Sequence, residues 1–556
     1  MAEETTRLLR TPTSSTSSTS SSSSASSGTS ISPARRAVLF ASIFLASYAY
    51  GLESQVRGTY QPYATSAFGL HSSLATLNVL RSVVAAASQP TASKLADVFG
   101  RLNVLVAASS LYTLGIAIEA VANSVPVFFV GAIIYQFGFT CIVLLMEVLI
   151  ADYSSMRARV FFSYLPALPF LINTWLSGVV TEAVLTHATW RLGIGMWALI
   201  YPICSMPLFI SLASIERQQA VDADADCKSL VLQDAIPTSV TELFHSLDVI
   251  GLIFLISAFS LVLAPLTRIG GTSSHGHWND PTILVPLVLG LFCVPAFVIW
   301  ERRGARTPLV PFHLLGDRGV WASLAVRTLL NCAWYTQANF LFTILIVAFD
   351  FPIEAATRIL SFYSFFGVFS GVAIGLLIYK IRRLRLIIII GTILFMLAFA
   401  LLIMHPGGAS ASAQSGMMGA QILLGLSAGL FAYPTQASIQ ASAAREYVAI
   451  LTGLYLAMYN VGGALGTSLA GAIWSQTLYP ALEANLAFQP NATLAAAVYN
   501  SPFDTIVHYP VGTEIRDAII TSYQGVQQLL CTAGLLLCIP MIAFAFALRN
   551  PHLSDH

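Results

Sequence analysis

Three charged residues, Glu53, Arg81 and Glu147, lie inside long apolar runs of the chain. A charge at membrane depth is costly and usually faces a cavity or a partner of opposite sign. Glu53 and Arg81 fall near the outer ends of two adjacent predicted helices, so they could form an ion pair, although Arg57 competes for Glu53 from one turn along the same helix. In such a site Glu53 could carry a proton and Arg81 could hold the anionic oxygens of a ligand. Alternatively, the pair only fixes helix packing.

Glu147 is the second candidate proton carrier, and Asp152, nearer the end of the same run, is the third. Removal from water disfavours an ionised carboxylate, so an embedded glutamate accepts a proton more readily than an exposed one. The alternative role for Glu147 is a structural ion pair with Arg101. Glu119 and Glu182 lie close to the ends of their apolar runs, so we expect water to solvate both.

Polar and aromatic side chains also gather within the apolar runs of both halves of the chain. A large polar ligand needs a few such groups among apolar walls to fix its orientation. Asn and Gln also make hydrogen bonds between helices, so both uses are open for any single residue. Arg327 could mirror Arg81 in the second half. The candidate binding residues are Arg81, Gln136, Asn173, Trp175, Arg327, Asn331, Tyr335, Tyr433, Gln436 and Asn460.

The elements that carry these residues must be membrane-spanning helices. Only 10% of the 556 residues are charged and the mean hydropathy is +0.74, whereas a soluble domain carries about 25% charged residues. A net charge of +1 offers no basic surface for nucleic acid. A spanning helix needs roughly 20 apolar residues, and fourteen segments qualify. They are 37–55, 73–95, 102–122, 125–150, 160–185, 192–213, 247–267, 281–300, 320–349, 355–379, 386–405, 414–440, 446–476 and 523–548.

The distribution of lysine and arginine predicts an even number of spans with both termini in the cytoplasm. With the N-terminus inside, 20 Lys and Arg residues fall in inside segments and 5 in outside segments, which is the asymmetry that the positive-inside rule expects. A miscount of one span would reverse the bias for every later loop. The sequon at Asn491, a candidate glycosylation site, falls in an outside loop of the same topology.

These spans predict an all-α protein of the lipid bilayer, and the resemblance described below implies their grouping into two six-helix bundles and two extra helices. The Ser/Thr-rich start of the chain cannot bury enough surface to fold. The predicted parts are a disordered cytoplasmic tail (1–36), a six-helix bundle (37–213), a cytoplasmic linker (214–246), two extra helices (247–300), a cytoplasmic loop (301–319), a second six-helix bundle (320–548) with an outer loop (477–522), and a cytoplasmic tail (549–556).

The loop after the second span reads Lys94-Leu95-Ala96-Asp97-Val98-Phe99-Gly100-Arg101. It resembles the short cytoplasmic signature of the major facilitator superfamily, and we interpret it as a gate latch. Gly100 permits a tight turn, and Asp97 can face the positive N-terminus of a helix. Arg101 can pair with Glu147 or Asp152 at the inner end of the fourth span.

Longer strings carry a more specific resemblance. They are Tyr50 to Glu53, Thr59 to Thr65, Leu80 to Val83, Glu147 to Asp152 and Trp190 to Trp197. Through them the chain resembles, from about residue 40 to 553, the fungal siderophore iron transporter family, a fourteen-span form of that superfamily. The resemblance implies proton-coupled import of ferric siderophores, largely hydroxamates, across a fungal plasma membrane by alternating access. A chelated iron needs no protein ligands, so we expect no metal site and no cofactor.

Alternative functions share the same architecture. In drug–proton antiporters the fourth helix carries an arginine before a Gln-Gly pair and the fifth a Gly-Pro-x-x-Gly-Gly string, and residues 134–139 and 164–178 contain neither. Their absence argues against a drug exporter, and an exporter or exchanger of drugs or thiol conjugates is kept as the alternative because it shares the fold. The short C-terminal tail disfavours a transporter-like sensor, and the absence of a nucleophile–base set or a nucleotide-binding string disfavours an enzyme.

A short pattern in the N-terminal tail concerns trafficking. Glu4, Leu8 and Leu9 fit an acidic dileucine sorting signal that adaptors could read, which would add endosomal vesicles or the vacuole to the plasma membrane as locations. His275 and His277 lie in an outer loop and lack the ligand count of a metal site.

Overall fold

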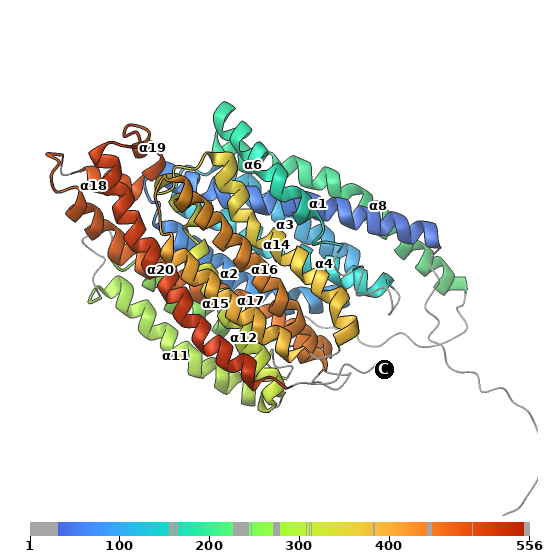
Figure 1. Ribbon diagram of the computed structural model, residues 1–556. Coiled ribbons are helices and arrows are strands. Elements are labelled where there is room, and N and C mark those ends of the chain that lie inside the picture. Colours follow the sequence, from blue (N-terminus) through green and yellow to red (C-terminus); the bar gives the residue numbers. More distant parts are fainter. Residues whose placement is uncertain are drawn as a thin grey trace, which may run out of the picture.

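Apolar stretches of this length form long helices, because in lipid every backbone N–H and C=O group must find its partner within the chain. The computed structural model describes residues 32–154, 162, 165–225, 244–245, 247–270, 278–306, 309–310, 312, 314–381, 384–441, 448–491 and 493–549. Within these ranges it contains helices and turns and no strand (Figure 1). The predicted all-α fold is confirmed.

The first half of the chain packs around its own apolar core, which consists of buried residues between Leu39 and Ile215. α1 packs on α6 and α8, and α4 packs on α2 and α3. The helices of this half are α1 (Pro33–Ala67), α2 (Ser73–Phe99), α3 (Arg101–Val121), α4 (Val125–Tyr153), α6 (Pro169–His187), α7 (Trp190–Gly195) and α8 (Trp197–Ala225).

The second half has a larger core that runs from Ala322 to Leu548 and also takes in Leu74 and Ala75 of α2. Its helices are α12 (Arg318–Ala338), α13 (Leu341–Val347), α14 (Ile353–Ile381), α15 (Arg385–Met404), α16 (Ala411–Ala441), α17 (Val448–Asn485), α18 (Leu494–Asn500), α19 (Pro502–Ile506) and α20 (Glu514–Ala547), preceded by the short η1 (Leu314–Gly316).

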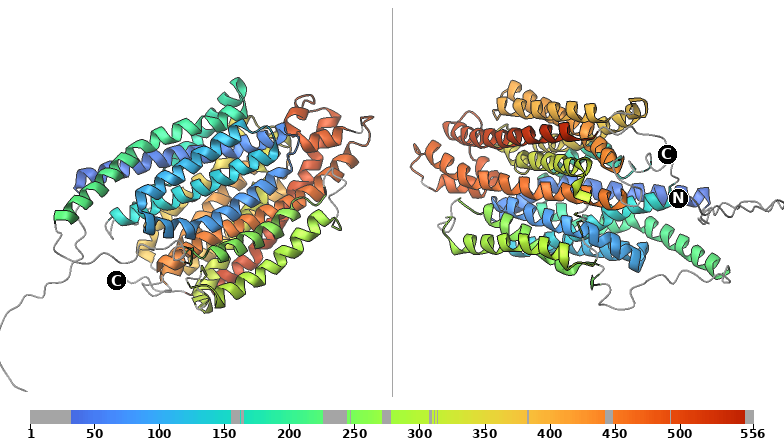
Figure 2. Two further views of the ribbon diagram at one scale, coloured as in Figure 1. Left: turned by 180° about the vertical axis from the view of Figure 1, so that it is seen from behind. Right: turned by 90° about the horizontal axis from the view of Figure 1, so that it is seen from below.

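Two further helices, α10 (Val249–Leu266) and α11 (Pro281–Arg303), pack against each other. α10 attaches this pair to α2 and α17. In Figure 1 and in the left view of Figure 2, α11 lies at one edge of the bundle and α8 at the opposite edge. The extra pair therefore adds to the outside of the bundle next to α2, which connects the two halves.

The described residues include 11 helical segments that are long and apolar enough to cross a membrane. α2, α6 and α17 have 27, 19 and 38 residues but fall outside this set. α2 carries Asn78, Arg81 and Lys94, which lower its mean hydropathy. The exact number of fourteen spans therefore stays a prediction.

Several helix boundaries differ from the predicted ones, because polar residues continue helices beyond their apolar centres. α1 was expected over 37–55 and runs over Pro33–Ala67, which places Glu53 near its middle instead of its outer end. The expected outer loop 477–522 is largely helical, since α17 continues to Asn485 and α18, α19 and the start of α20 follow. α8 continues into the expected linker as far as Ala225, and residues 226–243 lie outside the described ranges.

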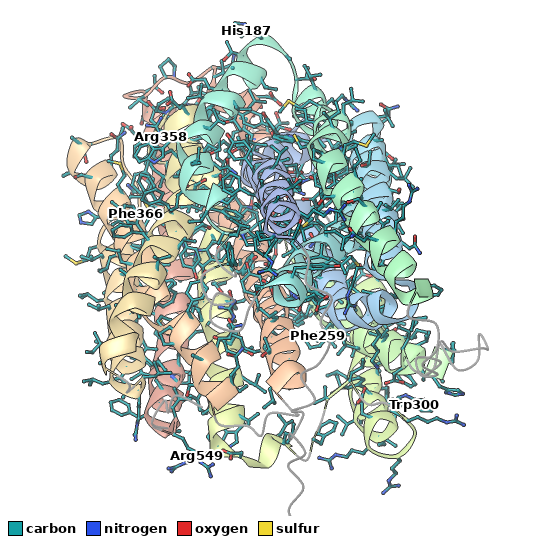
Figure 3. All side chains as sticks on the ribbon, turned by 90° about the vertical axis from the view of Figure 1, so that its right-hand side faces the viewer. His187, Phe259, Trp300, Arg358, Phe366 and Arg549 are labelled. Carbon is teal, nitrogen blue, oxygen red and sulfur yellow. The ribbon has the colours of Figure 1, made fainter. Side chains whose placement is uncertain are left out.

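The two ends of the bundle are named here by the orientation that the charge bias predicts. His187 and Arg358 lie toward one end, and Trp300 and Arg549 lie at the other (Figure 3). We call the end that carries α18 and α19 the outer end and the end that carries Gly100 and Arg549 the inner end.

Polar contacts join the two halves toward the outer end. Thr357 on α14 is hydrogen-bonded to Thr59 on α1 at 2.8 Å and to Thr181 on α6 at 3.1 Å. Asn78 on α2 donates to Asn339, which follows α12, at 2.9 Å. These contacts are called the outer gate below, and all three are formed in this structure.

Candidate functional site

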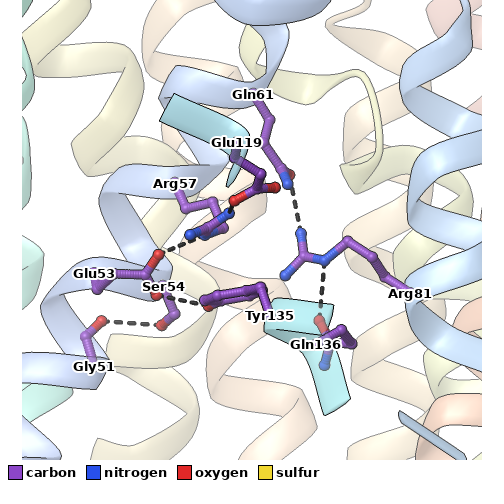
Figure 4. A network of polar contacts seen from close by, with 9 residues as sticks. All are labelled: Gly51, Glu53, Ser54, Arg57, Gln61, Arg81, Glu119, Tyr135 and Gln136. Atoms are coloured by element: carbon purple, nitrogen blue, oxygen red, sulfur yellow. Dashed lines mark hydrogen bonds and ion pairs between the residues drawn. The ribbon is translucent and has the colours of Figure 1, made fainter. Parts of the chain in front are cut away.

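A buried ion cluster joins α1 and α3 in the first half (Figure 4). The guanidinium of Arg57 donates from Nε to Glu53 Oε1 and from Nη1 to Glu119 Oε2. Tyr135 on α4 donates to the second oxygen of Glu53 at 2.6 Å, and Arg57 lies over the Tyr135 ring at 3.6 Å from its centroid. We call Glu53, Arg57 and Glu119 the ion cluster. All three side chains are at most 2% exposed.

Arg81 lies beside this cluster but does not bond to Glu53. Its Nε donates to Gln136 Oε1 at 2.9 Å and its Nη1 donates to Gln61 Oε1 at 3.0 Å (Figure 4). The sequence had left two partners open for Glu53, and the structure selects Arg57, which is four residues away on the same helix and therefore on the same face. Arg81 instead makes neutral contacts to amides, which a ligand oxygen can replace at lower cost than a carboxylate.

Glu119 was expected to be solvated, and this expectation is wrong. Its side chain is fully buried, because α3 and α4 approach closely where Gly131 faces it. A Cβ atom on Gly131 would lie 2.9 Å from Glu119 Cγ. Small residues permit this kind of approach between membrane helices. The sequence feature that indicates this burial is the set of glycines on the two helices, Gly115, Gly131 and Gly138, which permit close packing. The position of Glu119 near the end of its apolar run is misleading.

Glu147 and Arg327 are opposite charges on the two halves of the chain. The Glu147 side chain on α4 is exposed, although its neighbours Met146 and Ile150 are buried. Arg327 on α12 is the charged residue that acts on its carboxylate. Arg327 lies over the rings of Tyr455 and Tyr459 on α17, and its Nε is buried and has no hydrogen-bond partner among the described residues.

Further aromatic side chains of the second half pack on one another, and one of them, Tyr335, contacts Tyr459. Trp334 on α12 stacks on Tyr363 of α14 with ring centroids 4.4 Å apart. The hydroxyl groups of Tyr335 and Tyr459 are 3.1 Å apart. We call Trp334, Tyr335, Tyr363, Tyr455 and Tyr459 the aromatic group. Such a surface offers flat apolar area together with hydroxyl groups for hydrogen bonding.

Of the remaining candidate binding residues, two are buried and bonded to backbone carbonyls, and the others are at least partly accessible. Asn173 is fully buried and donates to the Tyr48 carbonyl at 3.2 Å, and Asn331 donates to the Arg327 carbonyl of its own helix at 2.8 Å, so both serve packing in this conformation. Trp175 is 53% exposed and lies under Arg358 beside Phe365. Tyr433, Gln436 and Asn460 are partly or largely accessible.

The predicted gate loop is a sharp turn at the inner end. Gly100 joins α2 to α3 with a φ of +85°, a conformation that glycine adopts without strain. Arg101 Nε lies 3.2 Å from Asp152 Oδ2, which makes Asp152 rather than Glu147 its partner. The Asp97 side chain lies outside the described residues.

Other predicted features are only partly covered by the structure. Asn491 is exposed, and its Oδ1 accepts from the N–H and the hydroxyl of Thr493. Glu4, Leu8, Leu9, His275 and His277 lie outside the described residues. Their predicted roles stay predictions.

Comparison with known protein families gives one match over most of the chain. The model of the Major Facilitator Superfamily matches residues 39–467. Among solved structures, a bacterial homolog of the human lysosomal transporter Spinster in an inward-facing, unoccupied conformation superposes with a TM-score of 0.58 at 14% identity, covering 93% of this chain and 97% of that one. The nucleoside transporter NupG superposes with a TM-score of 0.55 at 14% identity, covering 92% and 99%. These structures support the fold.

Several similar proteins are fungal iron transporters. Siderophore iron transporter 1 of Saccharomyces cerevisiae is 40% identical over 94% of this chain and 83% of its own length. Siderophore iron transporter ARN1 of the same yeast is 35% identical over 94% and 82%. MFS siderochrome iron transporter C of Aspergillus fumigatus is 32% identical over 92% and 83%. Because these relatives are transporters, the prediction that the chain is not an enzyme is confirmed. The chain belongs to the Major Facilitator Superfamily and, within it, to the fungal siderophore iron transporters.

Proposed function

We propose that this protein imports ferric siderophores of the hydroxamate class, coupled to protons, by alternating access. The names of its relatives support the cargo. The observation that carries the proposal is the pair of arginines on opposite halves. The Arg81 guanidinium is bonded only to neutral amides, and the Nε of Arg327 has no hydrogen-bond partner among the described residues. Major facilitator transporters bind substrate between their two halves and rock these halves about the site.

The chemistry of the cargo fits these donors. In a ferric trihydroxamate the chelator oxygens fill the coordination sphere of the iron, so a protein recognises the outer oxygens and the organic backbone. Guanidinium groups donate to such oxygens, and the aromatic group on the second half offers apolar contact area for the backbone. Arg81 would release Gln61 and Gln136 when it binds the chelate, and both amides can then bond to polar groups of the cargo.

The ion cluster provides a proton site because its charges do not balance internally. Glu53 and Glu119 share one guanidinium, that of Arg57. With both carboxylates ionised, Glu53, Glu119 and Arg57 carry one surplus negative charge. Among the described residues, the only charge that offsets it is the neighbouring Arg81, which is bonded to amides and not to either carboxylate. A charge that loses its compensation at this depth is costly. One proton on either carboxylate removes this charge. We propose that Glu53 together with Glu119 holds a transported proton, and that Glu147 holds one on the path to the inner side.

The proposed setting follows the charge bias of the loops. The protein resides in the plasma membrane with both termini in the cytoplasm, and two six-helix bundles flank the proposed binding site, with α10 and α11 as the extra pair. Adaptors that read Glu4, Leu8 and Leu9 direct part of the population to endosomal vesicles or the vacuole. The loop with Asp97, Gly100 and Arg101 acts as a latch that controls opening of the inner end of the bundle, which we call the inner gate. The ion pair between Arg101 and Asp152 supports this role.

Uptake of radio-iron tests this function directly. Cells that lack other siderophore carriers and express this protein are given iron chelated to ferrichrome, coprogen or triacetylfusarinine, with and without a protonophore. We expect accumulation of at least one chelate, and the protonophore should abolish it. If the protein reaches the surface and none accumulates, the import function is wrong, and efflux from preloaded cells or vesicles then tests the exporter and exchanger alternatives.

A further inference from the structure

His71 connects the two halves at the outer gate. It lies in the turn between α1 and α2 and is fully buried. Its Nε2 is 2.9 Å from the hydroxyl oxygen of Thr343 on α13, and its Nδ1 is 3.4 Å from that of Thr65 on α1. Its backbone N–H donates to the carbonyl of Asn500, the last residue of α18, at 3.2 Å. One residue of the first half thus contacts two elements of the second half.

Aromatic rings of the second half enclose the imidazole. Phe503 on α19 meets it edge-on with centroids 5.6 Å apart, and the rings of Phe340 and Trp474 lie at 6.2 Å. Phe340 and Trp474 stack on each other at 3.9 Å. These rings belong to the segment after α12, to α17 and to α19, so the pocket exists only while the two halves are together. Opening the outer gate would remove most of its wall.

The hydrogen bonds around His71 suit the neutral ring. The Thr65 hydroxyl donates to the carbonyls of Gln61 and Pro62, so it can only accept from His71 Nδ1. Nδ1 therefore carries the proton, and Nε2 accepts from the Thr343 hydroxyl. A second proton, on Nε2, would place a positive charge in a pocket of rings and hydroxyl groups.

The titratable groups nearby do not offset that charge. The Pro62 carbonyl favours the charged form, but burial is the larger effect and lowers the pKa of His71 to about 4. Asp504 on α19 and Glu483 on α17 are exposed, Asp504 acting on Tyr63 and Glu483 on Tyr479. α13 carries no titratable residue. The titratable groups of the packed elements are Tyr63 on α1, Tyr479 and Glu483 on α17, Tyr499 on α18, Asp504 on α19 and, behind Trp474, Tyr523 on α20.

We propose that His71 is the latch of the outer gate and that a proton from the outer medium releases it. The neutral imidazole bridges Thr65 and Thr343 and holds the gate closed, and the imidazolium is stable only where water can reach it, in the open gate. This role goes beyond the proposed function, because it assigns the step at which outside acidity starts the cycle. It rests on alternating access but not on the identity of the cargo or on the ion cluster.

The sign of the pH effect follows from linkage. The closed gate has the lower affinity for the proton, so acid shifts the population toward the open gate, and this shift disappears above the ordinary pKa of 6.5. With an open-state pKa of 6.5 and a closed-state pKa near 4, the ratio of open to closed molecules rises about 30-fold between pH 7.5 and pH 5.

The position of the gate can be measured without any siderophore. Spin labels on Leu70→Cys and Val507→Cys, two exposed sites on opposite halves, report the distance across the gate in the full-length protein in lipid nanodiscs. Cys204, Cys227 and Cys293 are replaced by alanine to prevent side labelling. We expect the long-distance population to grow on going from pH 7.5 to pH 5. In His71→Gln this growth should vanish, whereas His187→Gln, an exposed outer histidine of the same half, should keep it.

Thr343→Val supplies an independent check, because it keeps the titrating ring and removes its partner. It should raise the open population already at pH 7.5 and still respond to acid. The proposal is overturned if the unmodified gate does not respond to pH, if His71→Gln responds as fully as His187→Gln does, or if Thr343→Val leaves the ratio unchanged. If the gate responds to pH as expected but the protein takes up no chelate, the proposed cargo is wrong and the role of His71 is still supported.

Discussion

Arg57 on α1 and Glu119 on α3 form an ion pair with both side chains closed off from water, although 62 residues separate them in the chain. Arg57 holds Glu53 at the same time. One guanidinium is therefore bonded to two buried carboxylates, and the three residues are not equivalent. Loss of Arg57 leaves two buried carboxylates without a bonded cation, whereas loss of one carboxylate leaves Arg57 bonded to the other.

This asymmetry predicts the stabilities of variants. Arg57→Met should destabilise the protein by about 3–5 kcal/mol, the range for removing one partner of a buried ion pair. Glu119→Gln should cost much less, because Arg57 and Glu53 remain paired. The double variant should recover part of the loss of Arg57→Met. Melting temperatures in detergent measure this cycle, and strictly additive effects would show that the two residues do not interact.

Glu147 is predicted to be essential for coupling and dispensable for folding. Glu147→Gln should abolish chelate accumulation driven by a proton gradient while leaving the amount of protein at the surface unchanged, since the exposed side chain takes no part in the core. Glu483→Gln, an exposed carboxylate at the outer end of α17, is the matched control and should transport normally. Uptake by Glu147→Gln at the unmodified rate would leave the ion cluster as the proton site.

Arg327 is predicted to bind the cargo, and Asn331 on the same helix is predicted not to. Removing a charged donor typically weakens binding by about 1.5–3 kcal/mol, so Arg327→Gln should raise KM for the chelate about tenfold or more. Asn331→Ala should change KM little, because its amide already bonds to the Arg327 carbonyl within α12. The comparison needs initial uptake rates over a range of chelate concentrations. Equal KM values for the two variants would remove Arg327 from the binding site.

Much of the fold could be predicted because a long apolar run in lipid is stable only as a helix, which pairs its own backbone N–H and C=O groups. The helices around Glu147 and Arg327 and the sharp turn at Gly100 lie where the sequence predicted them. The ends of helices could not be placed in this way. α1 continues through the polar stretch from Gln55 to Gln61 because neighbouring helices, not lipid, surround it.

The site was harder to predict because partners are chosen by packing between distant helices. Glu119 is near the end of an apolar run, yet the close contact of α3 and α4 at Gly131 buries it. The sequence allowed either Arg81 or Arg57 to pair with Glu53. Arg57 is the partner because it lies four residues away on the same face of the helix. His71 carries no local signal at all, since its pocket consists of rings from α17, α19 and the segment after α12.

The orientation of the protein is tested at Asn491. This side chain is exposed in the segment between α17 and α18, and the charge bias places that segment outside. A sequon that faces the lumen during synthesis can receive a glycan. Endoglycosidase should therefore increase the gel mobility of the unmodified protein and not that of Asn491→Gln. An epitope at the same place that antibodies reach only after permeabilisation would reverse the assigned orientation.

The Arg101–Asp152 pair is predicted to control turnover and not stability. Its members are 27% and 43% exposed, and a pair this accessible contributes less than about 1 kcal/mol to folding. Its position beside the turn at Gly100, where α2 and α3 meet the end of α4, allows it instead to bias the inner gate. Asp152→Asn and Asp97→Asn should each lower the maximal uptake rate severalfold, with little change in melting temperature or in KM. The exchanged pair, Arg101→Asp with Asp152→Arg, should restore part of the rate, because it restores the attraction. If the single variants turn over at the unmodified rate, or if the exchanged pair is no faster than they are, the contact is not a latch.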